Sequence, residues 1–384
     1  MRWLFLLLCL SNAAWAQGRW RPVGALNQAR HGHTATLLND GRVLIVGGIG
    51  ADSLSALATA EVFNPRTQSF TSVGSMAQGR FGHTATKLND GRVLIVGGAA
   101  FSDDSRPRFV ALASVEIFDP RTSRFVPAPS LAQGRHWHTA TLLNDGRVLV
   151  AGGAREEMHH LASVEWWNPQ KHSWSNGTAL QTPRCMHQAQ LLPSGAVLMS
   201  GGRSNERQTG FGHVLASSEV WPSAGARDST PVDMNEPRQN HGVWLSHAGQ
   251  VLAVGGKTEG ALTNLIEAFD PATQRWQPFA PSLPLPLAHH SVTSLDAKGF
   301  LVAGGETPNT PDTSQTQWLD AAAGRFCRAG ELNVSRREHT ATRLKDGTVL
   351  VVGGLSSGVA EGSAERWQPL KGVCTAPQGL TAVP

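Results

Sequence analysis

The chain has 384 residues and a formal net charge of +4; 40% of its residues are hydrophobic, 16% are charged, and it contains 41 glycines and 22 prolines. So few charges, without any basic run, are not the footprint of a nucleic-acid-binding protein. Many glycines and few long apolar periodic runs indicate an all-β protein with many turns.

The first sixteen residues, MRWLFLLLCLSNAAWA, predict a secretory signal peptide. A basic Arg2 precedes a short apolar run, and Ala14-Trp15-Ala16 has the small-x-small pattern of a cleavage site. The run is shorter than the roughly 20 residues that span a bilayer, and no second run of that length follows. A lipoprotein would use Cys9, but a large leucine precedes it. We expect export to the periplasm or the outside of the cell, without a transmembrane segment.

Three cysteines follow this leader: Cys185, Cys327 and Cys374. Because three is an odd number, at most one internal disulfide forms and one thiol stays free. Whether Cys327 and Cys374 are bonded is left open. The hydrophobic core, rather than a disulfide scaffold, must hold the fold.

One unit is repeated seven times along the chain. HTATLLNDGRVLIVGG, at 33–48, returns as HTATKLNDGRVLIVGG and HTATLLNDGRVLVAGG. The Gly-Gly doublets begin at Gly47, Gly97, Gly152, Gly201, Gly255, Gly304 and Gly353. A period near 50 with a doublet in each unit is typical of kelch propellers. On these motifs the chain resembles the kelch-repeat β-propeller family, in particular secreted bacterial kelch proteins, over nearly its whole mature length.

Each unit is predicted to form four strands. HTATLL and VLIVGG make a hairpin through Asn-Asp-Gly-Arg, expected as a two-residue turn. A third strand follows, such as Ala60 to Pro65, and a fourth carries an aromatic residue in most copies. The fold class is therefore all-β: one seven-bladed propeller of four antiparallel strands per blade. The domain covers 17–376, with units starting near 24, 74, 129, 178, 232, 281 and 330, and 377–384 form a C-terminal tail.

The two ends of the chain are expected to close the ring. The last unit lacks the aromatic fourth strand, whereas GRWRPVGAL near the N-terminus matches RTQSFTSVGSM at the next junction. We therefore predict that Trp20 to Val23 forms the outer strand of blade 7. An alternative uses Lys371 to Ala376, since Cys374 aligns with Cys327.

An arginine and a glutamate recur at fixed places in six units. The arginines stand three residues before the first-strand histidine, and the glutamates lie in the third strand: Arg30, Arg80, Arg135, Arg184, Arg238 and Arg336 with Glu61, Glu116, Glu165, Glu219, Glu267 and Glu365. Unit 6 lacks both, having Leu287 and Gln317. The absence of both the arginine and the glutamate from unit 6 predicts that they form a structural ion pair in the other six blades, because either residue alone would be a buried unpaired charge. The alternative is an anion-binding ring of arginines.

A histidine opens the first strand of every unit: His33, His83, His138, His187, His241, His290 and His339. It persists in unit 6, so it does not belong to the ion pair. We predict a packed, hydrogen-bonded side chain between blades, since seven copies spread around a ring lie too far apart to bind one metal ion. The loop residues Glu156-Glu157 and His159-His160 are likewise predicted to be solvent-exposed rather than metal ligands. No metal, cofactor or catalytic residue is predicted.

The two positions between the arginine and the histidine vary from unit to unit and are expected at the mouth of the channel. The second-to-third strand loops vary as well, and variable loops on a rigid scaffold commonly carry binding. The predicted ligand-binding residues are His31, Phe81, His136, Trp137, Gln239, Asn240, His289, Arg337 and Glu338. Aromatic and amide side chains in this set suit a sugar or a peptide.

Two enzyme families resemble the repeated unit. The propeller of galactose oxidase and related copper radical oxidases is similar, but their chemistry requires a tyrosyl radical and this chain has no Tyr. Periplasmic kelch mutarotases acting on sialic acid are the alternative, for which His136, Glu338 or His289 would supply a general acid–base pair. We instead predict an exported, monomeric, non-catalytic module that binds an extracellular or periplasmic protein or glycan.

Overall fold

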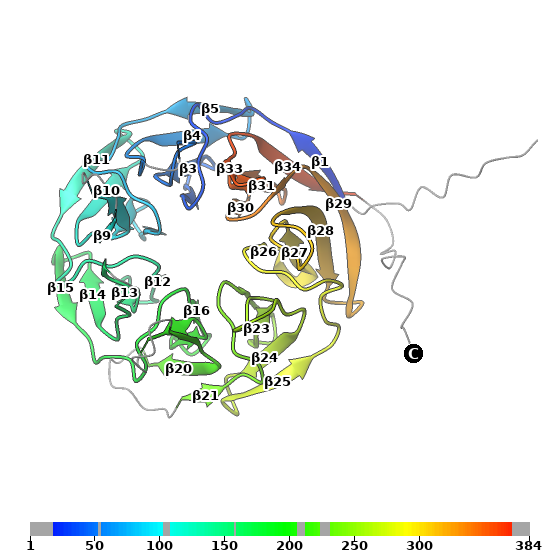
Figure 1. The fold of residues 1–384 in the computed structure, drawn as a ribbon. Helices are drawn as coiled ribbons and strands as arrows, with labels where there is room; N and C mark the ends of the chain where they lie inside the picture. Colours follow the sequence, from blue (N-terminus) through cyan, green and yellow to red (C-terminus); the bar gives the residue numbers. More distant parts are fainter. Residues whose placement is uncertain are drawn as a thin grey trace, which may run out of the picture.

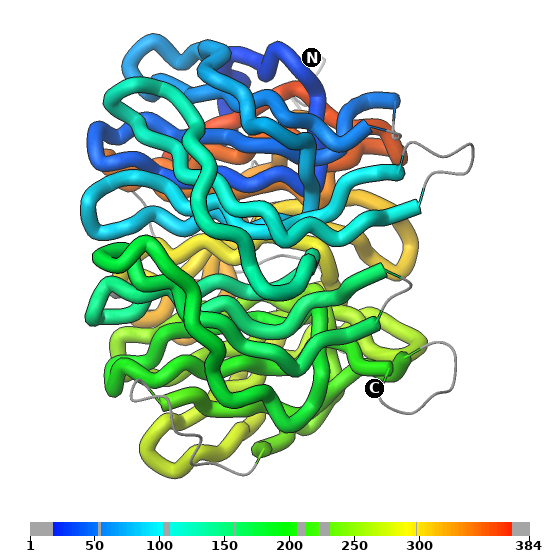
Figure 2. The backbone as a smooth tube through the Cα atoms, turned by 90° about the vertical axis from the view of Figure 1, so that its left-hand side faces the viewer, coloured from blue at the N-terminus to red at the C-terminus, as the bar shows by residue number. Residues whose placement is uncertain are grey.

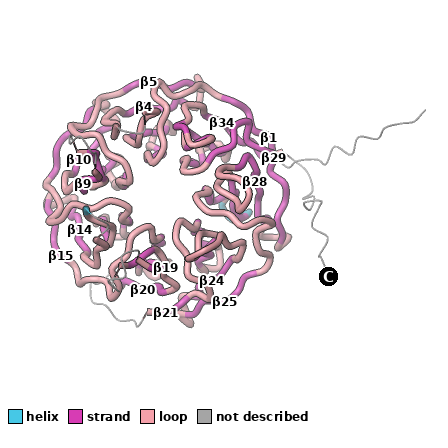
Figure 3. Tube along the Cα trace, in the orientation of Figure 1, coloured by secondary structure: helices cyan, strands magenta, loops and turns pink. Residues whose placement is uncertain are grey.

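The computed structural model describes residues 18–52, 55–102, 108–156, 159–205, 212–222 and 231–370. Within them seven four-stranded antiparallel sheets are arranged radially around a central axis (Figure 1). Seen from the side, the strands run between the two faces of a disc (Figure 2), and Figure 3 shows loops joining the radial sets. The all-β, seven-bladed prediction is confirmed.

The strands of the first four blades, from the axis outward, are these. Blade 1 has β2 (Thr34–Leu37), β3 (Val43–Val46), β4 (Ala60–Asn64) and β5 (Ser69–Ser72); blade 2 has β6 (Thr84–Lys87), β7 (Val93–Val96), β10 (Val115–Asp119) and β11 (Arg124–Ala128); blade 3 has β12 (Thr139–Leu142), β13 (Val148–Ala151), β14 (Val164–Asn168) and β15 (Ser173–Asn176); blade 4 has β16 (Gln188–Leu191), β17 (Val197–Ser200), β20 (Ser217–Trp221) and β21 (Val232–Asp233).

The other three blades follow the same order. Blade 5 has β22 (Gly242–Leu245), β23 (Val251–Val254), β24 (Ile266–Asp270) and β25 (Arg275–Phe279); blade 6 has β26 (Ser291–Ser294), β27 (Gly299–Ala303), β28 (Thr313–Asp320) and β29 (Arg325–Arg336); blade 7 has β30 (Thr340–Arg343), β31 (Val349–Val352), β34 (Ala364–Pro369) and β1 (Gly18–Pro22). Three small hairpins and one 3-10 turn complete the elements: β8 (Ala99–Phe101) with β9 (Phe109–Ala111), β18 (Arg203–Ser204) with β19 (His213–Val214), β32 (Leu355–Ser356) with β33 (Val359–Ala360), and η2 (Asp296–Lys298).

The second strand of every blade is buried along its whole length, as its continuous apolar sequence requires. Its side chains alternate between the two neighbouring blades. On one side Leu44 and Val46 of β3 pack with Val93 and Ile95 of β7 in a shared cluster. The core is thus a series of apolar layers between blades, so each blade depends on its neighbours.

The N-terminal strand closes the ring, as predicted. β1 pairs antiparallel with β34, and Trp20 lies opposite Trp367. The indole N–H of Trp20 donates to Oγ1 of Thr316 in blade 6 at 3.0 Å. A Cβ on Gly18 would lie 1.8 Å from the Trp367 indole nitrogen, so a larger residue does not fit there. The alternative strand at Lys371 to Ala376 lies outside the described residues.

The hairpin between the first two strands is longer than predicted. Leu38 donates its N–H to the carbonyl of Arg42 at 2.8 Å, which leaves three residues in the loop rather than two. Gly41 closes the loop with φ of 90°, the left-handed conformation that a three-residue loop needs at this place. The Asp-Gly signal was correct for a hairpin but wrong for its length.

Candidate functional site

The variable pairs of residues before the first strands and the Gly-Gly doublets meet on one side of the disc, which we call the ring face. In every blade the first variable position pairs with the residue after the doublet, as His31 does with Ile49. The second-to-third strand loops start at the same place. The variable parts of all seven units therefore gather around one end of the channel.

The recurrent arginines form the buried ion pairs predicted from the sequence. Arg30 and Glu61 are 0% and 1% exposed, and the guanidinium lies 3.0 Å from the carboxylate. Arg30 also donates to the carbonyl of Gly47 at 2.8 Å, and Glu61 accepts the N–H of Asn27 at 2.9 Å. In the other five pairs the distance between the guanidinium nitrogen and the carboxylate oxygen is 2.5 to 3.0 Å.

Blade 6 replaces the pair by two buried uncharged residues, Leu287 and Gln317, which are 2% and 7% exposed. Gln317 lies opposite Val302 in the sheet, just as Glu61 lies opposite Ile45, so the positions are equivalent. The arginines are thus part of the frame, and their buried guanidinium groups are not available to a ligand on the ring face.

Six of the seven histidines form hydrogen bonds between neighbouring blades. Nε2 of His83 lies 2.9 Å from Oγ1 of Thr34 in the preceding blade, and the equivalent contacts are 2.9 to 3.1 Å for five further histidines. His290 is the exception: Gly242 stands where the partner hydroxyl would be, and neither ring nitrogen has a hydrogen-bond partner among the described residues.

Burial lowers the pKa of all seven histidines, and neighbouring arginines lower it further in most of them. The pKa falls to about 3 for His83, His187 and His339 and to about 4 for His290, and it lies well below 6.5 for His33, His138 and His241. These rings are therefore neutral at physiological pH. Their role as inter-blade hydrogen-bonding groups matches the prediction.

The second variable position of each unit lines the ring face. All seven residues have a left-handed backbone, with φ between 50° and 62°: Gly32, Gly82, Trp137, Met186, Asn240, His289 and Glu338. In six of the seven the N–H group donates to the carbonyl of the corresponding residue in the preceding blade. The series runs from the Gly82 N–H to the Gly32 carbonyl at 3.3 Å through to the Glu338 N–H to the His289 carbonyl at 3.2 Å. Backbones so linked lie about 4.8 Å apart, and seven of them enclose a ring about 11 Å across.

The first variable position lies beneath this ring. Phe81, His136 and Gln239 are 4%, 1% and 5% exposed, whereas His31 and Arg337 are half-buried. The nine predicted ligand-binding residues are therefore divided into an accessible set at the rim and a supporting set below it. Gln239 contributes to the support, not to the surface.

Five aromatic side chains form one cluster over blades 2 and 3, which we call the aromatic patch: Phe81, Phe101, Phe109, His136 and Trp137. Phe109 is the exposed member, at 42%, and its ring centroid lies 5.2 Å from Phe81, 5.5 Å from Phe101 and 6.5 Å from Trp137. Trp137 leans over Gly82, where a Cβ would lie 3.0 Å from the indole. The glycine of blade 2 thus makes room for the tryptophan of blade 3.

A polar cluster lies on the opposite part of the rim, over blades 5, 6, 7 and 1: His31, Asn240, Lys257, His289, Glu306 and Glu338. The Glu338 carboxylate lies 3.2 Å from Nδ1 of His31 and 3.9 Å from Nδ1 of His289. His289 Nε2 lies 3.2 Å from Asn240 and 3.9 Å from Glu306, which in turn lies 3.6 Å from Lys257. A carboxylate held between two imidazoles faces the channel.

Electrostatics keep this cluster in defined protonation states. Burial lowers the pKa of His289, and the charges of Glu338 and Glu306 only partly oppose this. Burial raises the pKa of Glu338, but the hydrogen bond to His31 and the neighbouring His289 outweigh it, so the pKa is lowered. At neutral pH Glu338 is a carboxylate beside the neutral imidazole of His289, ready to accept hydrogen bonds.

Four members of these two groups were missed by the sequence analysis: Phe101, Phe109, Lys257 and Glu306. A signal for two of them exists. Lys257 and Glu306 directly follow a Gly-Gly doublet, so the repeat alignment places them beside the first variable position. Phe101 and Phe109 belong to the β8–β9 hairpin, whose counterparts β18–β19 in blade 4 and β32–β33 in blade 7 contain no phenylalanine.

The loop residues Glu156 and His160 were predicted to be solvent-exposed, but both are half-buried because they form hydrogen bonds to neighbouring blades. Glu156 accepts the N–H of Ala111 at 3.1 Å, and His160 donates its N–H to Asn205 at 3.4 Å. Within the described ranges no group of three or more His, Cys, Asp or Glu side chains is placed to hold a metal ion; Glu157 lies outside those ranges. Cys185 is a buried free thiol whose pKa burial raises to about 12.

Comparison with known proteins decides the family. The model of the KLHDC2/KLHL20/DRC7 kelch-repeats domain matches residues 82–305, and that of the kelch motif matches residues 29–77. The chain belongs to the kelch-repeat family. Kelch propellers mediate interactions with other molecules, so membership points to a binding or interaction module.

Two similar proteins extend this kelch assignment. Beta-scruin of Limulus polyphemus is 29% identical over 157 residues, which are 38% of this chain and only 17% of that relative. A fungal alcohol oxidase of the AA5 family, solved in complex with copper, has a TM-score of 0.72 at 16% identity over 92% of this chain and 76% of the oxidase. At that identity the likeness shows the propeller fold alone. In the part of this kelch propeller that the structure describes, no helix is long and apolar enough to cross a membrane.

Proposed function

We propose that the protein is an exported, monomeric, non-catalytic kelch module that binds a carbohydrate at the ring face. The observation that carries this is the pairing of the aromatic patch with the polar cluster on a single rim about 11 Å across. Aromatic rings such as Phe109 and Trp137 offer flat apolar surface, and Glu338, Asn240 and His289 offer hydrogen-bonding groups. Binding sites for small polar ligands combine these two features.

The size of the rim limits the ligand to one sugar unit at the ring itself. Because the diameter of about 11 Å joins backbone positions and includes the width of the backbone itself, the ring has room for no more than one pyranose, and the remainder of a glycan would extend over the β8–β9 hairpin. The ionised Glu338 accepts hydrogen bonds from sugar hydroxyls, and its two imidazole neighbours hold it in place. Asn240 adds donors and an acceptor beside it.

Export is part of this proposal. It is supported by the leader pattern of residues 1–16 and by the apolar run that is too short to span a bilayer. N-terminal sequencing of protein recovered from the periplasm or the medium is expected to start at Gln17. Protein that stays in the cytoplasmic fraction with Met1 intact would contradict export. The monomeric state is tested separately: light scattering after size-exclusion chromatography is expected to give the mass of one chain.

The binding test is a glycan array with three variants. Trp137→Ala and Phe109→Ala remove the apolar surface, Glu338→Gln removes the acceptor charge, and each is expected to lose most of the signal. Val126→Ala is the matched control, because Val126 is 47% exposed on the outer strand of blade 2, away from the ring face. Binding that survives all three ring-face variants would move the site elsewhere.

A carbohydrate-active enzyme remains the second candidate, on one observation. Glu338 and His289, both predicted for a mutarotase-like acid–base pair, lie 3.9 Å apart at the rim. The third candidate, His136, is 1% exposed beneath the aromatic patch, and burial lowers its pKa to about 4. NMR of sialic acid anomer exchange distinguishes the two functions: a binding module leaves the exchange rate unchanged, whereas acceleration that Glu338→Gln abolishes would establish the enzyme.

A further inference from the structure

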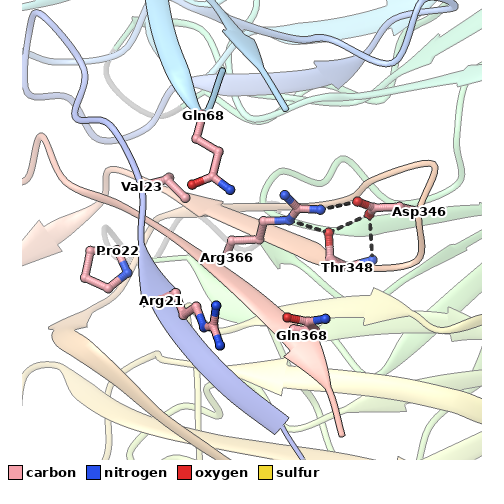
Figure 4. Close-up of a pocket in the computed structure, with 8 residues that line it drawn as sticks. All are labelled: Arg21, Pro22, Val23, Gln68, Asp346, Thr348, Arg366 and Gln368. Carbon is pink, nitrogen blue, oxygen red and sulfur yellow. Dashed lines mark hydrogen bonds and ion pairs between the residues drawn. The ribbon is translucent and has the colours of Figure 1, made fainter. Parts of the chain in front are cut away.

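A groove of about 400 Å³ lies where β1 closes the ring, outside the ring face (Figure 4). It is formed by the closing strand, the neighbouring strand β34, the blade 7 hairpin and one turn of blade 1. The polar residues that line it are Arg21, Gln68, Asp346, Thr348, Arg366 and Gln368.

Two arginines occupy opposite positions on the closing strands. Arg21 of β1 is in register with Arg366 of β34, and side chains so placed have Cβ atoms about 5 Å apart. Like charges directly opposite one another destabilise a sheet. The arrangement therefore opposes ring closure unless something compensates it.

The other blades show that the frame does not need this pair. In the five other blades where the structure describes the equivalent third- and fourth-strand pair, both residues are uncharged: Val62 with Thr71, Ile117 with Val126, Trp166 with Ser175, Ala268 with Gln277, and Trp318 with Cys327. Five blades therefore have no charged residue at this position of the sheet. Only at the seam, among these described pairs, do two arginines lie opposite each other in the sheet.

The charges in the groove do not cancel. Arg366 donates to Oγ1 of Thr348 at 2.8 Å and forms an ion pair with Asp346, which neutralises it. Arg21 is exposed and has no hydrogen-bond or ion-pair partner among the described residues. Figure 4 shows its guanidinium pointing away from that of Arg366, in the same part of the view as Gln368, while Gln68 lies at the other end of the groove. The groove thus holds one uncompensated positive charge with amide groups nearby.

We propose that this groove is a binding site for an oxyanion, that is, a carboxylate, sulfate or phosphate group. The planar fork of Arg21 matches such groups bidentately, and amide N–H groups of the two glutamines complete the donors. A volume of about 400 Å³ accommodates a small ligand. Because the groove exists only when β1 is paired with β34, the bound anion also stabilises the closed ring. This site is independent of the proposed function of the ring face.

The test measures anion binding to the full-length mature protein at constant ionic strength. Sulfate and phosphate are titrated by calorimetry and by the shift of the melting temperature, and dextran sulfate and polygalacturonate form a second arm. The unaltered protein is expected to bind, and Arg21→Gln is expected to weaken the affinity about tenfold or more. Arg275→Gln is the control, since Arg275 is an exposed arginine on the fourth strand of blade 5.

Each outcome decides the proposal. Binding in either arm that Arg21→Gln weakens and Arg275→Gln leaves intact supports the site and tells whether a free anion or an acidic polymer occupies it. Without ligand, Arg21→Gln is expected to melt at the same temperature as the unaltered protein or above it, because like-charge repulsion is removed. Absence of anion binding, equal weakening by both variants, or a ligand-free Arg21→Gln protein that melts lower would overturn the proposal.

Discussion

Nε2 of His83 lies 2.9 Å from Oγ1 of Thr34, and the two residues belong to different blades. The contact recurs around the ring wherever the preceding blade offers a hydroxyl group. Together with the hydrogen bond from the second glycine of each doublet to the next blade, as from Gly48 to the carbonyl of Arg80 at 2.8 Å, it holds neighbouring sheets in one geometry. Stability of this propeller is therefore a property of junctions between blades.

Thr34→Val tests this junction. The substitution leaves the buried Nε2 of His83 without its partner, and we expect the free energy of unfolding to fall by about 1–3 kcal/mol. Thr34→Ser keeps the hydroxyl and is expected to stay closer to the unaltered protein. Urea denaturation measures both; equal losses for valine and serine would show that packing, rather than the hydrogen bond, matters at this position.

The Arg80–Glu116 pair predicts non-additive behaviour. Arg80→Leu alone leaves a buried carboxylate unpaired, and we expect a loss of about 3–5 kcal/mol. Arg80→Leu combined with Glu116→Gln reproduces the uncharged residues of blade 6 and is expected to recover much of that loss. Equilibrium unfolding of the single and double variants gives the coupling energy, and a coupling near zero would contradict the pairing.

The buried histidines predict a dependence of stability on pH. Their folded-state pKa values lie at about 3–4 or well below 6.5, so between these values and 6.5 the unfolded chain binds more protons than the folded one. Stability is then complete above pH 6.5 and falls as the pH decreases toward 3–4. Unfolding free energies between pH 7.5 and 4.5 check this.

His290→Leu serves as the matched variant for this pH effect. His290 has a pKa of about 4 and lacks the hydroxyl partner in the preceding blade that the other six histidines have, so its replacement removes a titrating group without removing an inter-blade hydrogen bond. We expect a shallower loss of stability on acidification than in the unaltered protein. An identical slope would show that other groups govern the acid limb.

The last prediction concerns the strand that closes the ring. Deleting residues 17–22 exposes the edge of β34 and the buried side of Trp367, and we expect the entire ring to lose stability in one cooperative transition. Gly18→Val is expected to act in the same direction, since no side chain fits beside Trp367. Arg19→Ala, on the exposed face of β1, is the control. Calorimetry showing loss of blade 7 alone would argue against a single cooperative ring.

The frame could be predicted because the chain contains its own alignment. Seven copies expose which residues are invariant, and the joint loss at Leu287 and Gln317 was enough to predict the ion pair. The same reasoning was less successful at the rim. It did not separate buried Phe81 from accessible Trp137, because burial at adjacent positions depends on which way a left-handed residue directs its side chain.

Repetition and local hydrophobic pattern were enough to predict the number of blades, the strand order and the ion pairs, and they favoured the N-terminal strand over residues 371–376 for closing the ring. The side chains that lie together on the ring face and at the closing strand could be identified only from the folded ring. The ring of Phe109 packs against Trp137, and Arg21 lies opposite Arg366 in the sheet of blade 7. These residues come from different segments of the chain, and the repeat pattern does not specify their pairing. Such contacts arise when the ring closes, and no single unit encodes them.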